Sequence, residues 1–509
     1  MSLANLIHLT AERRPGHPAI VMDDASTSYL ELSAEVDAAA GWLLKQQVQG
    51  GEIVALGLPQ VPYWQLVFAL GALRLGATPA VLGSRPLQEI AALGRPRVLC
   101  ALGSALARVP ELAVMGISPK DFAILRNTRQ VRGLPAVDSA AQGAGLVLFG
   151  GFVEPRAVRL DGATGQGRLR ATAGAHGIDA ASAVLCLLED NPGHWLEVAL
   201  AVFASGATLA IPRRPATAAA LAARVGVDRL IVSPRILGSL LKLGQPLTGL
   251  ATRRLSLVGG PMLAHTVPAI TAHIAAEAQQ VGWAGETGVY AQVPASELPQ
   301  GRGCLGRPLP GVELVARDGQ SGAKLAPGTT GLIWARTPWM ATAYLDGAQA
   351  DGPRGLAGGW NATGLLGHAG PAGLWLVNRS LMPRPAPAGS GPAAAPRKPL
   401  SRGEMEAALL KLRGLLEVCV LSRPTGEGRS EPVIVYVGDE DGAPAAVSPR
   451  VSDLLEGQPF HLVRLPKLPR SPDGVVARSA LAKALEPELR IALARRLASA
   501  EAPAGGPPR

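Results

Sequence analysis

Aromatic side chains make up only 4% of this chain, so Ala, Leu and Val must supply most of its hydrophobic core. The four cysteines lie far apart and form no CxxC pair, which favours buried free thiols over a zinc site or a disulfide framework. No apolar run is long enough to span a bilayer, because the longest, Val61–Leu82, is interrupted by Gln65 and Arg74. Met1–Gly16 lacks the features of a signal peptide. We therefore expect a cytoplasmic protein without a membrane span.

Dense clusters of basic residues are also missing, although the formal net charge is +10. The Lys and Arg residues are dispersed and do not alternate with aromatics, which favours a solvated arginine-rich surface over a nucleic-acid interface. A positive surface also suits an acidic partner such as CoA or an acidic carrier protein. We therefore expect no nucleic-acid partner.

The chain is long and able to build hydrophobic cores. Its 509 residues are 48% hydrophobic and 17% charged, a composition typical of globular proteins. A chain of this length is expected to form roughly two to four domains.

Short apolar runs alternate with helical patterns over most of the first 380 residues, as in βα units. Strands are expected at Glu52–Leu58, Gly76–Leu82, Val184–Leu188 and Gly206–Ile211, and helices at Val61–Leu75 and His194–Ala204. The sequence GATPAVL at Gly76–Leu82 resembles GATLAI at Gly206–Ile211, which suggests two related helix–strand units. The pattern predicts a multi-layer α/β body.

Residues 303–379 are richer in turns and short strands, which predicts a small β subdomain at the end of a large N-terminal domain, residues 1–379. Its expected strands are Val312–Ala316, Gly331–Ala335 and Leu374–Val377. Residues 380–400 then read as a Pro/Ala/Gly linker that can form no core.

A small C-terminal α+β domain is expected at residues 401–490. It begins with an amphipathic helix, Ser401–Leu412, whose Ser401 and Glu404 match a capping box. Strands at Glu417–Leu421 and Pro432–Val437 follow. Residues 491–509 are expected to form a tail that is disordered at its end.

Five short segments occur in an order and spacing that resemble the adenylate-forming, or AMP-binding, superfamily of acyl-CoA synthetases and acyl-acid ligases. They are GALRLGATPAVL (Gly71–Leu82), LVGGPML (Leu257–Leu263), GRPLPGVEL (Gly306–Leu314), GGWNATG (Gly358–Gly364) and SPDGVVARSAL (Ser471–Leu481). The resemblance runs from about Leu6 to Leu485. It implies a reaction in which a carboxylate attacks the α-phosphate of ATP, giving acyl-AMP and pyrophosphate, before a thiol such as CoA displaces AMP. Such chemistry requires phosphate, magnesium and ribose contacts.

The segment that matches the family's phosphate loop is Leu148–Val158. Gly150 keeps its place, and Arg156 replaces the family's lysine with a different cationic geometry. The hydroxyl residues of the family loop are replaced by Phe149, Phe152 and Val153. A strand-to-loop turn without a phosphate role is the more economical interpretation.

The segment Val281–Gly288 (VGWAGETG) resembles the family motif in which a threonine contacts phosphate and a glutamate holds magnesium. If the segment is aligned on its glutamate, Glu286 is the metal ligand; if it is aligned on Trp283, the order of Glu286 and Thr287 is reversed. Glu286 is therefore the candidate magnesium ligand and Thr287 a candidate nucleotide contact. A solvated loop carboxylate is an equally weighted alternative for Glu286.

Two positions lose a polar side chain that the family uses. Leu365 stands at the ribose aspartate and can accept no hydrogen bond from the ribose hydroxyls, and Val475 stands at the catalytic lysine and can neutralise no charge on the phosphate. Arg379 matches an arginine able to reach a ribose or a phosphate. The sequence thus predicts no catalytic residue with certainty.

His194 resembles the family's histidine near the acyl entrance and is the candidate residue of a substrate pocket. A histidine at a helix start is the alternative. Gly260 and Pro261 resemble the turn beside adenine, and they equally suit a simple strand-ending turn.

Three hypotheses follow from these residues. The first is a pseudoenzyme or divergent member that binds an acyl or CoA-type ligand or a protein partner without normal adenylation. The second is an active divergent AMP-forming acyl- or aryl-acid ligase, for which ATP and Mg²⁺ are required and CoA or a carrier protein is the acceptor. The third is an unrelated basic binding protein. The sequence thus makes no cofactor certain.

Overall fold

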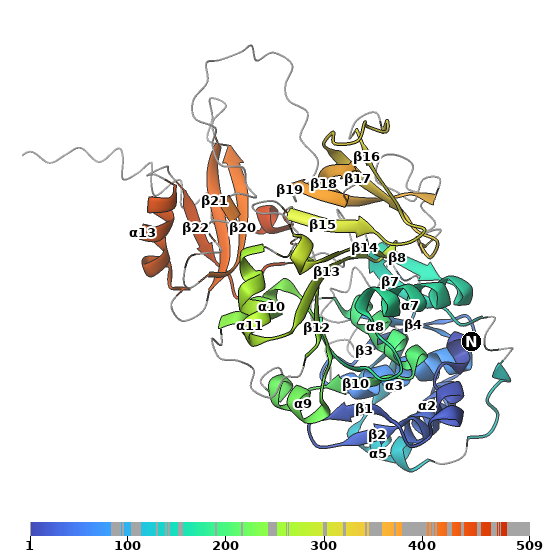
Figure 1. Ribbon diagram of the computed structural model, residues 1–509. Helices are drawn as coiled ribbons and strands as arrows, with labels where there is room; N and C mark the ends of the chain where they lie inside the picture. Colours follow the sequence, from blue (N-terminus) through green and yellow to red (C-terminus); the bar gives the residue numbers. More distant parts are fainter. Residues whose placement is uncertain are drawn as a thin grey trace, which may run out of the picture. The chain divides into compact units, whose positions relative to one another are not determined.

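The fold is seen in a computed structural model of the chain (Figure 1). The structure describes residues 2–82, 93, 96–102, 113–128, 131–137, 140, 143–150, 156–188, 191–214, 217–242, 252–260, 262, 264–298, 303–318, 322–341, 344–345, 359–370, 373–378, 405–406, 409, 412, 415–424, 430–438, 442–455, 460–469, 476, 478 and 480–485. Backbone contacts divide the chain into a first unit, Met1–Arg384 with Ser471–Val475, and a second unit, Pro385–Arg470 with Val476–Arg509. The domain limits expected from the sequence stay a prediction.

The first unit contains a six-stranded sheet in the order β6-β5-β3-β4-β7-β8. These strands are β3 (Ile53–Gly57), β4 (Thr78–Val81), β5 (Arg97–Ala101), β6 (Ala113–Ile117), β7 (Leu146–Gly150) and β8 (Arg156–Leu160). All neighbours in this sheet are parallel except β7 and β8, which form an antiparallel pair. The helices interspersed with them are α2 (Tyr29–Lys45), α3 (Pro62–Leu75) and α5 (Pro119–Asn127).

A thirteen-stranded sheet follows the order β16-β17-β18-β19-β15-β14-β13-β12-β11-β9-β10-β1-β2. Its part from β1 to β13 is parallel, and its strands are β1 (Pro18–Met22), β9 (Ala183–Leu187), β10 (Thr208–Ile211), β11 (Arg229–Val232), β12 (Arg254–Val258) and β13 (Glu277–Ala284). The short β2 (Ser26–Ser28) adds an antiparallel edge. The accompanying helices are α1 (His8–Arg13), α7 (Gly162–His176), α8 (Pro192–Ser205), α9 (Ala218–Val225), α10 (Pro234–Lys242) and α11 (Val267–His273).

Beyond β13 the same sheet becomes antiparallel. The strands concerned are β14 (Gly288–Pro294), β15 (Gly303–Pro308), β16 (Glu313–Arg317), β17 (Gly331–Arg336), β18 (Asn361–Gly370) and β19 (Gly373–Asn378). The three strands expected in this region are confirmed as β16, β17 and β19. They extend the large sheet through β14 and β15 rather than forming a sheet of their own.

The first unit contains two βαβ repeats, one in each sheet, which confirm the related units expected from the sequence. In the α3 repeat, α3 joins the parallel neighbours β3 and β4; in the α8 repeat, α8 joins β9 and β10. Each helix begins with proline and ends before a left-handed glycine, Gly76 (φ +83°) or Gly206 (φ +73°). Glycine adopts this φ without steric cost, and it ends the helix cleanly.

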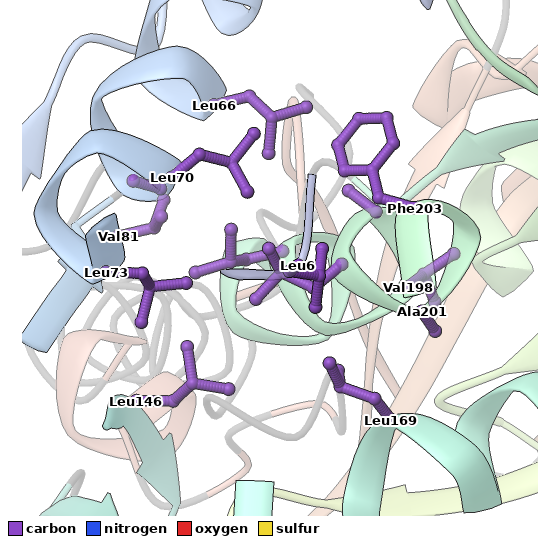
Figure 2. Close-up of a cluster of buried hydrophobic side chains, with 14 of the residues drawn as sticks. Leu6, Leu66, Leu70, Leu73, Val81, Leu146, Leu169, Val198, Ala201 and Phe203 are labelled. Atoms are coloured by element: carbon purple, nitrogen blue, oxygen red, sulfur yellow. The ribbon is translucent and has the colours of Figure 1, made fainter. Parts of the chain in front are cut away.

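Both repeat helices are apolar around almost their whole circumference, as expected for helices buried in the core of a large unit. Figure 2 shows side chains of one continuous buried cluster that both helices share. Leu66, Leu70 and Leu73 come from α3, and Val198 and Phe203 come from α8. This shared core fixes α8, whose first turn carries a candidate site residue, against the rest of the unit.

The second unit contains a three-stranded sheet in the order β20-β21-β22. Its strands are β20 (Leu415–Pro424), β21 (Ser430–Gly438) and β22 (His461–Arg464), accompanied by α13 (Pro444–Leu454). The first two strands confirm those expected at Glu417–Leu421 and Pro432–Val437. The capping box predicted at Ser401 and Glu404 lies outside the described residues.

The expected α/β class is confirmed by these sheets and helices. Among the helices that the structure describes, none is both long and apolar enough to cross a membrane.

Candidate active site

The tight turn between β13 and β14 carries two candidate residues, Glu286 and Thr287. Both are buried, with exposed fractions of 2% and 0%. The antiparallel pairing of Ala284 with Gly288 closes the turn, and Gly288 adopts a left-handed φ of +70°. The alternative of a solvated loop carboxylate does not describe Glu286, because this side chain is almost entirely buried.

Glu286 is held by residues that follow β17. The Tyr344 hydroxyl donates to Glu286 Oε1 at 2.9 Å, and the Ala341 amide donates to the Glu286 carbonyl at 2.8 Å. A carboxylate with a fixed direction is suitable for binding a cation, because less conformational freedom is lost on binding.

Thr287 is also engaged within the chain. Its hydroxyl donates to the Gly288 carbonyl at 3.1 Å, and its own carbonyl accepts from the Thr337 hydroxyl at 2.8 Å. The hydroxyl proton is therefore directed to the backbone. A phosphate contact through this proton would require the bond to Gly288 to break.

A buried arginine, Arg168 of α7, lies behind this turn. Its Nη2 donates to the carbonyls of Ala284 and Gly285 at 2.9 and 2.8 Å, and its Nη1 is 3.5 Å from the Glu286 carbonyl oxygen. Its Nε donates to Glu197 Oε2 at 2.8 Å, and both side chains are 0% exposed. The guanidinium thus connects two helices to the turn.

Glu197 of α8 accepts from two further donors. Trp283 Nε1 donates to Glu197 Oε2 at 3.1 Å, and the Thr172 hydroxyl donates to Glu197 Oε1. The Arg168 guanidinium carbon lies 5.8 Å from the centroid of the Trp283 ring. This pairing compensates the desolvation of a carboxylate that no water reaches.

His194, in the first turn of α8, stacks on Trp283 with ring centroids 4.6 Å apart and an interplanar angle of 6°. Asn191 Oδ1 caps this helix by accepting from the His194 amide at 3.0 Å. The His176 ring is 5.6 Å from the His194 ring, centroid to centroid. In the part of the chain that the structure describes, none of the four ring nitrogens of His176 and His194 has a hydrogen-bond partner.

Both histidines are neutral at physiological pH. Burial lowers the pKa of His176 to about 3. Burial also holds the pKa of His194 well below its ordinary value, assisted by the neighbouring His176 and Arg168. A charged imidazole in this position would lose its hydration without gaining an anionic partner.

Two residues expected near the nucleotide, Leu365 and Phe149, are buried in hydrophobic clusters. Leu365 is 6% exposed in β18 and belongs to the main hydrophobic cluster. Phe149 is 2% exposed in β7 and packs in a separate apolar cluster with Val147 and Ala157. Neither position provides an acceptor for a ribose hydroxyl or a donor for a phosphate.

The other candidates are placed only in part. Gly150 ends β7 and pairs with Arg156 of β8, whose side chain lies outside the described residues. Gly260 is buried after β12. Pro261, Arg379, Val475 and Phe152 lie outside the described residues.

The described residues fit a magnesium ion better than a nucleotide. Magnesium commonly takes one or two protein carboxylates and completes its shell with water and phosphate, so Glu286 meets that minimum. No group of three or more His, Cys, Asp or Glu side chains gathers within the described ranges. The ribose end does not fit, because Leu365 is apolar and offers ATP no acceptor for its ribose hydroxyls.

Arg168, Glu197 and Trp283 form the polar centre of this site, and the sequence patterns emphasised only Trp283. Glu197 interrupts the apolar run WLEVALAVF of α8, which is a readable signal of a buried charge. The sequence holds no matching signal for its partner, because Arg168 is 29 residues away on a helix that carries a second, exposed arginine, Arg170.

Comparisons with known proteins agree with this architecture. The model of the family "AMP-binding enzyme" matches residues 7–94 and 178–345. Novobiocin biosynthesis protein H of Streptomyces niveus is 28% identical over an alignment of 383 residues, and the match covers 68% of this chain and 59% of that protein. The match thus spans less than two thirds of that relative's length.

Solved structures of ligases share the fold. An anthranilate CoA ligase in complex with anthranoyl-AMP has a TM-score of 0.77 at 15% identity, with 96% of this chain and 98% of that chain covered. A benzoate CoA ligase from Burkholderia xenovorans LB400 has a TM-score of 0.72 at 20% identity, with 94% and 99% covered. The family model matches about half of the chain, and the superfamily expected from the sequence motifs is confirmed: this chain belongs to the AMP-binding enzyme family.

Proposed function

We propose that this family member binds an acyl or aryl acid, or its CoA thioester, without adenylating the acid with ATP. The observation that carries the proposal is the buried Leu365 in β18. The family resemblance places a ribose-binding aspartate at this position, and a leucine leaves both ribose hydroxyls without an acceptor. Desolvating those hydroxyls without a partner would weaken nucleotide binding.

The environment of Phe149 supports the same proposal. Its ring is buried among Val147, Ala157 and other apolar side chains of the six-stranded sheet. The resemblance places a hydroxyl-rich phosphate loop here. A phenylalanine in the hydrophobic core provides no hydrogen bond to a phosphate oxygen, and the described strand ends at Gly150.

The residue that the resemblance places near the acyl entrance, His194, belongs to an aromatic stack. His194 and Trp283 present two parallel rings at the start of α8 and the end of β13. Stacked flat rings of this kind suit an aromatic or extended acyl group. The named substrates of the similar ligases, benzoate and anthranilate, are aromatic acids, which supports this choice of ligand class.

An active ligase is the second candidate function. It is favoured by Glu286, a buried carboxylate with a fixed direction at the position that the resemblance assigns to the magnesium ligand. An active enzyme would form acyl-AMP and pyrophosphate and then transfer the acyl group to CoA or a carrier-protein thiol. Cytoplasmic location and an acidic carrier partner stay predictions from the sequence.

Three measurements on the purified full chain separate these functions. Isothermal titration with Mg·ATP and ATP–pyrophosphate exchange with benzoate, anthranilate and octanoate test adenylation. Thermal shift with benzoyl-CoA and octanoyl-CoA tests thioester binding. We expect a shift with at least one thioester and no exchange. Exchange with any of the three acids would overturn the proposal and establish the second candidate function. If neither thioester shifts the melting temperature, CoA thioesters are excluded as the proposed ligands.

A further inference from the structure

The turn between β13 and β14 is fastened from two sides by groups that are distant in sequence. On one side, the Ala341 amide and the Thr337 hydroxyl donate to the carbonyls of Glu286 and Thr287. On the other side, Arg168 donates to the carbonyls of Ala284 and Gly285. Four consecutive carbonyls, from Ala284 to Thr287, therefore have donors outside the turn.

The donor on the second side, Arg168, is paired with Glu197, and the α3 repeat has no carboxylate at the place that corresponds to Glu197. Pro62 and Pro192 start α3 and α8, and the same number of residues separates each proline from its terminal glycine. Counted from these prolines, Glu197 corresponds to Val67, which is 0% exposed in α3. The α3 repeat is packed with an aliphatic side chain at this position. The charged Glu197 in the α8 repeat therefore requires an explanation from its own surroundings. Buried ion pairs often add little stability over apolar replacements.

We propose that Arg168 and Glu197 form a positioning pair that fixes the backbone of the turn Gly285–Thr287 and so, together with the Tyr344 hydroxyl, sets the direction of the Glu286 carboxylate. Glu197 orients the guanidinium through the bond to Nε, and the remaining edge of the guanidinium holds the turn carbonyls. Neither side chain touches the ligand in this role.

The geometry depends on the planar fork of arginine. One guanidinium serves a carboxylate on Nε and two carbonyls on Nη2, whereas a lysine ammonium is a compact point charge that lacks this spread of donors. Gly288 makes the close approach possible. A Cβ at this position would lie 2.9 Å from Arg168 Nε, on a backbone that already has a left-handed φ.

Hydrogen exchange of the full chain tests the pair directly. We expect Arg168→Lys to accelerate exchange of the amides of residues 284–289 and of Ala341 by about tenfold, while amides of β9 and β11 keep their rates. A pair that contributes only global stability would accelerate all of these amides together. Uniform acceleration, or no change at the turn, would overturn the proposal.

Arg74→Lys is the matched control. Arg74 of α3 also donates to a carboxylate, Asp37, and to a backbone carbonyl, that of Pro135. Its replacement should leave exchange at the turn unchanged. If Arg168→Lys does not fold, Glu197→Gln serves instead, because an amide oxygen can still accept from Trp283 while the charge that orients Arg168 is lost.

A binding measurement then relates the pair to the proposed ligand, and this step rests on the proposed function. Because Glu197 also accepts from Trp283, whose ring the proposed function places beside the acyl group, benzoyl-CoA should bind Arg168→Lys about tenfold more weakly than it binds the unchanged chain or Arg74→Lys. If Arg168→Lys accelerates amide exchange only at the turn but leaves the benzoyl-CoA affinity unchanged, the pair positions the turn and has no role in ligand binding. If the unchanged chain does not bind benzoyl-CoA, the proposed function fails, while the exchange result still decides the positioning pair.

Discussion

The α3 and α8 repeats share length, caps and strand connections, but they differ in what their helices bury. The α3 repeat buries Trp64 in its first turn, stacked on Phe122. At the corresponding place the α8 repeat buries His194, stacked on Trp283. The same architecture therefore tolerates either an indole or an imidazole here, as it tolerates either Val67 or Glu197 one turn further along.

This difference separates residues that build the fold from residues that serve a site. Apolar side chains in the α3 repeat meet the requirement for core packing, which scales with the apolar area removed from water. The polar substitutions in the α8 repeat concentrate beside the turn that carries Glu286. Polar groups that cost desolvation without improving packing are typical of functional regions.

The largest expected effect comes from breaking the ion pair of the α8 repeat. Arg168→Met should destabilise the chain by about 3–5 kcal/mol, because it leaves Glu197 buried without its cation. Arg74→Met in the α3 repeat should cost much less, about 1 kcal/mol, since Asp37 is 34% exposed and remains hydrated. Urea denaturation of both variants measures the contrast. Equal losses would show that the two arginines are energetically equivalent.

The second-largest contrast in stability is expected between the glycines that end the two repeat helices, Gly76 and Gly206. A Cβ at Gly76 would lie 2.9 Å from the Ala140 carbonyl oxygen, whereas a Cβ at Gly206 would first meet the Thr10 methyl group at 3.5 Å. Gly206→Ala should therefore cost only the left-handed φ, about 1 kcal/mol. Gly76→Ala should cost about 2–3 kcal/mol, because backbone atoms must also move. Thermal denaturation of the two variants would contradict this expectation if Gly206→Ala were the less stable.

Acid should weaken the α8 repeat through His176 and His194. Their pKa values are lower in the folded chain than in the unfolded chain, so the unfolded state takes up protons first and stability falls as pH drops below about 6.5. For His176, whose folded pKa is about 3, the loss between pH 6.5 and 5 should be about 2 kcal/mol. Denaturant titrations of the chain and of His176→Phe at both pH values check this. An unchanged pH dependence in the variant would exclude His176 as the titrating group.

The smallest expected effect concerns the support of Glu197. Thr172→Val removes one hydroxyl donor and leaves Arg168 and Trp283 in place, so the free energy of unfolding should fall by about 1 kcal/mol. Thr78→Val in the α3 repeat is a suitable control, because the Thr78 hydroxyl is buried and has no hydrogen-bond partner within the described residues. This control should not be destabilised. If Thr78→Val lowers the free energy of unfolding as much as Thr172→Val does, the effect comes from the change in side-chain shape and not from the lost hydrogen bond.

Local patterns in the sequence were sufficient to predict the strands and helices of the two βαβ repeats and five further strands, β16, β17, β19, β20 and β21. The run Val61–Leu75 and the segment GATPAVL correctly predicted α3 and β4, because an apolar helix that ends at glycine before a buried strand leaves few alternatives. The start of α2 could be predicted from the sequence in the same way. Ser28 and Glu31 form the capping box that starts α2.

The site was less predictable because its geometry depends on contacts between distant residues. Glu286 could be singled out from the motif, but its burial and its bond to Tyr344, 58 residues away, could not be foreseen. Arg168 reaches carbonyls 116 and 117 residues along the chain, and backbone carbonyls carry no residue-specific signal in a sequence. Side-chain identity alone therefore cannot indicate such a pair.

The irregular register between Gly282 and Trp283 in the β13–β14 pair has an evolutionary consequence. A β-bulge accommodates one extra residue without altering the pairing on either side of it. This hairpin can therefore gain or lose a residue by insertion or deletion while every strand keeps its neighbours.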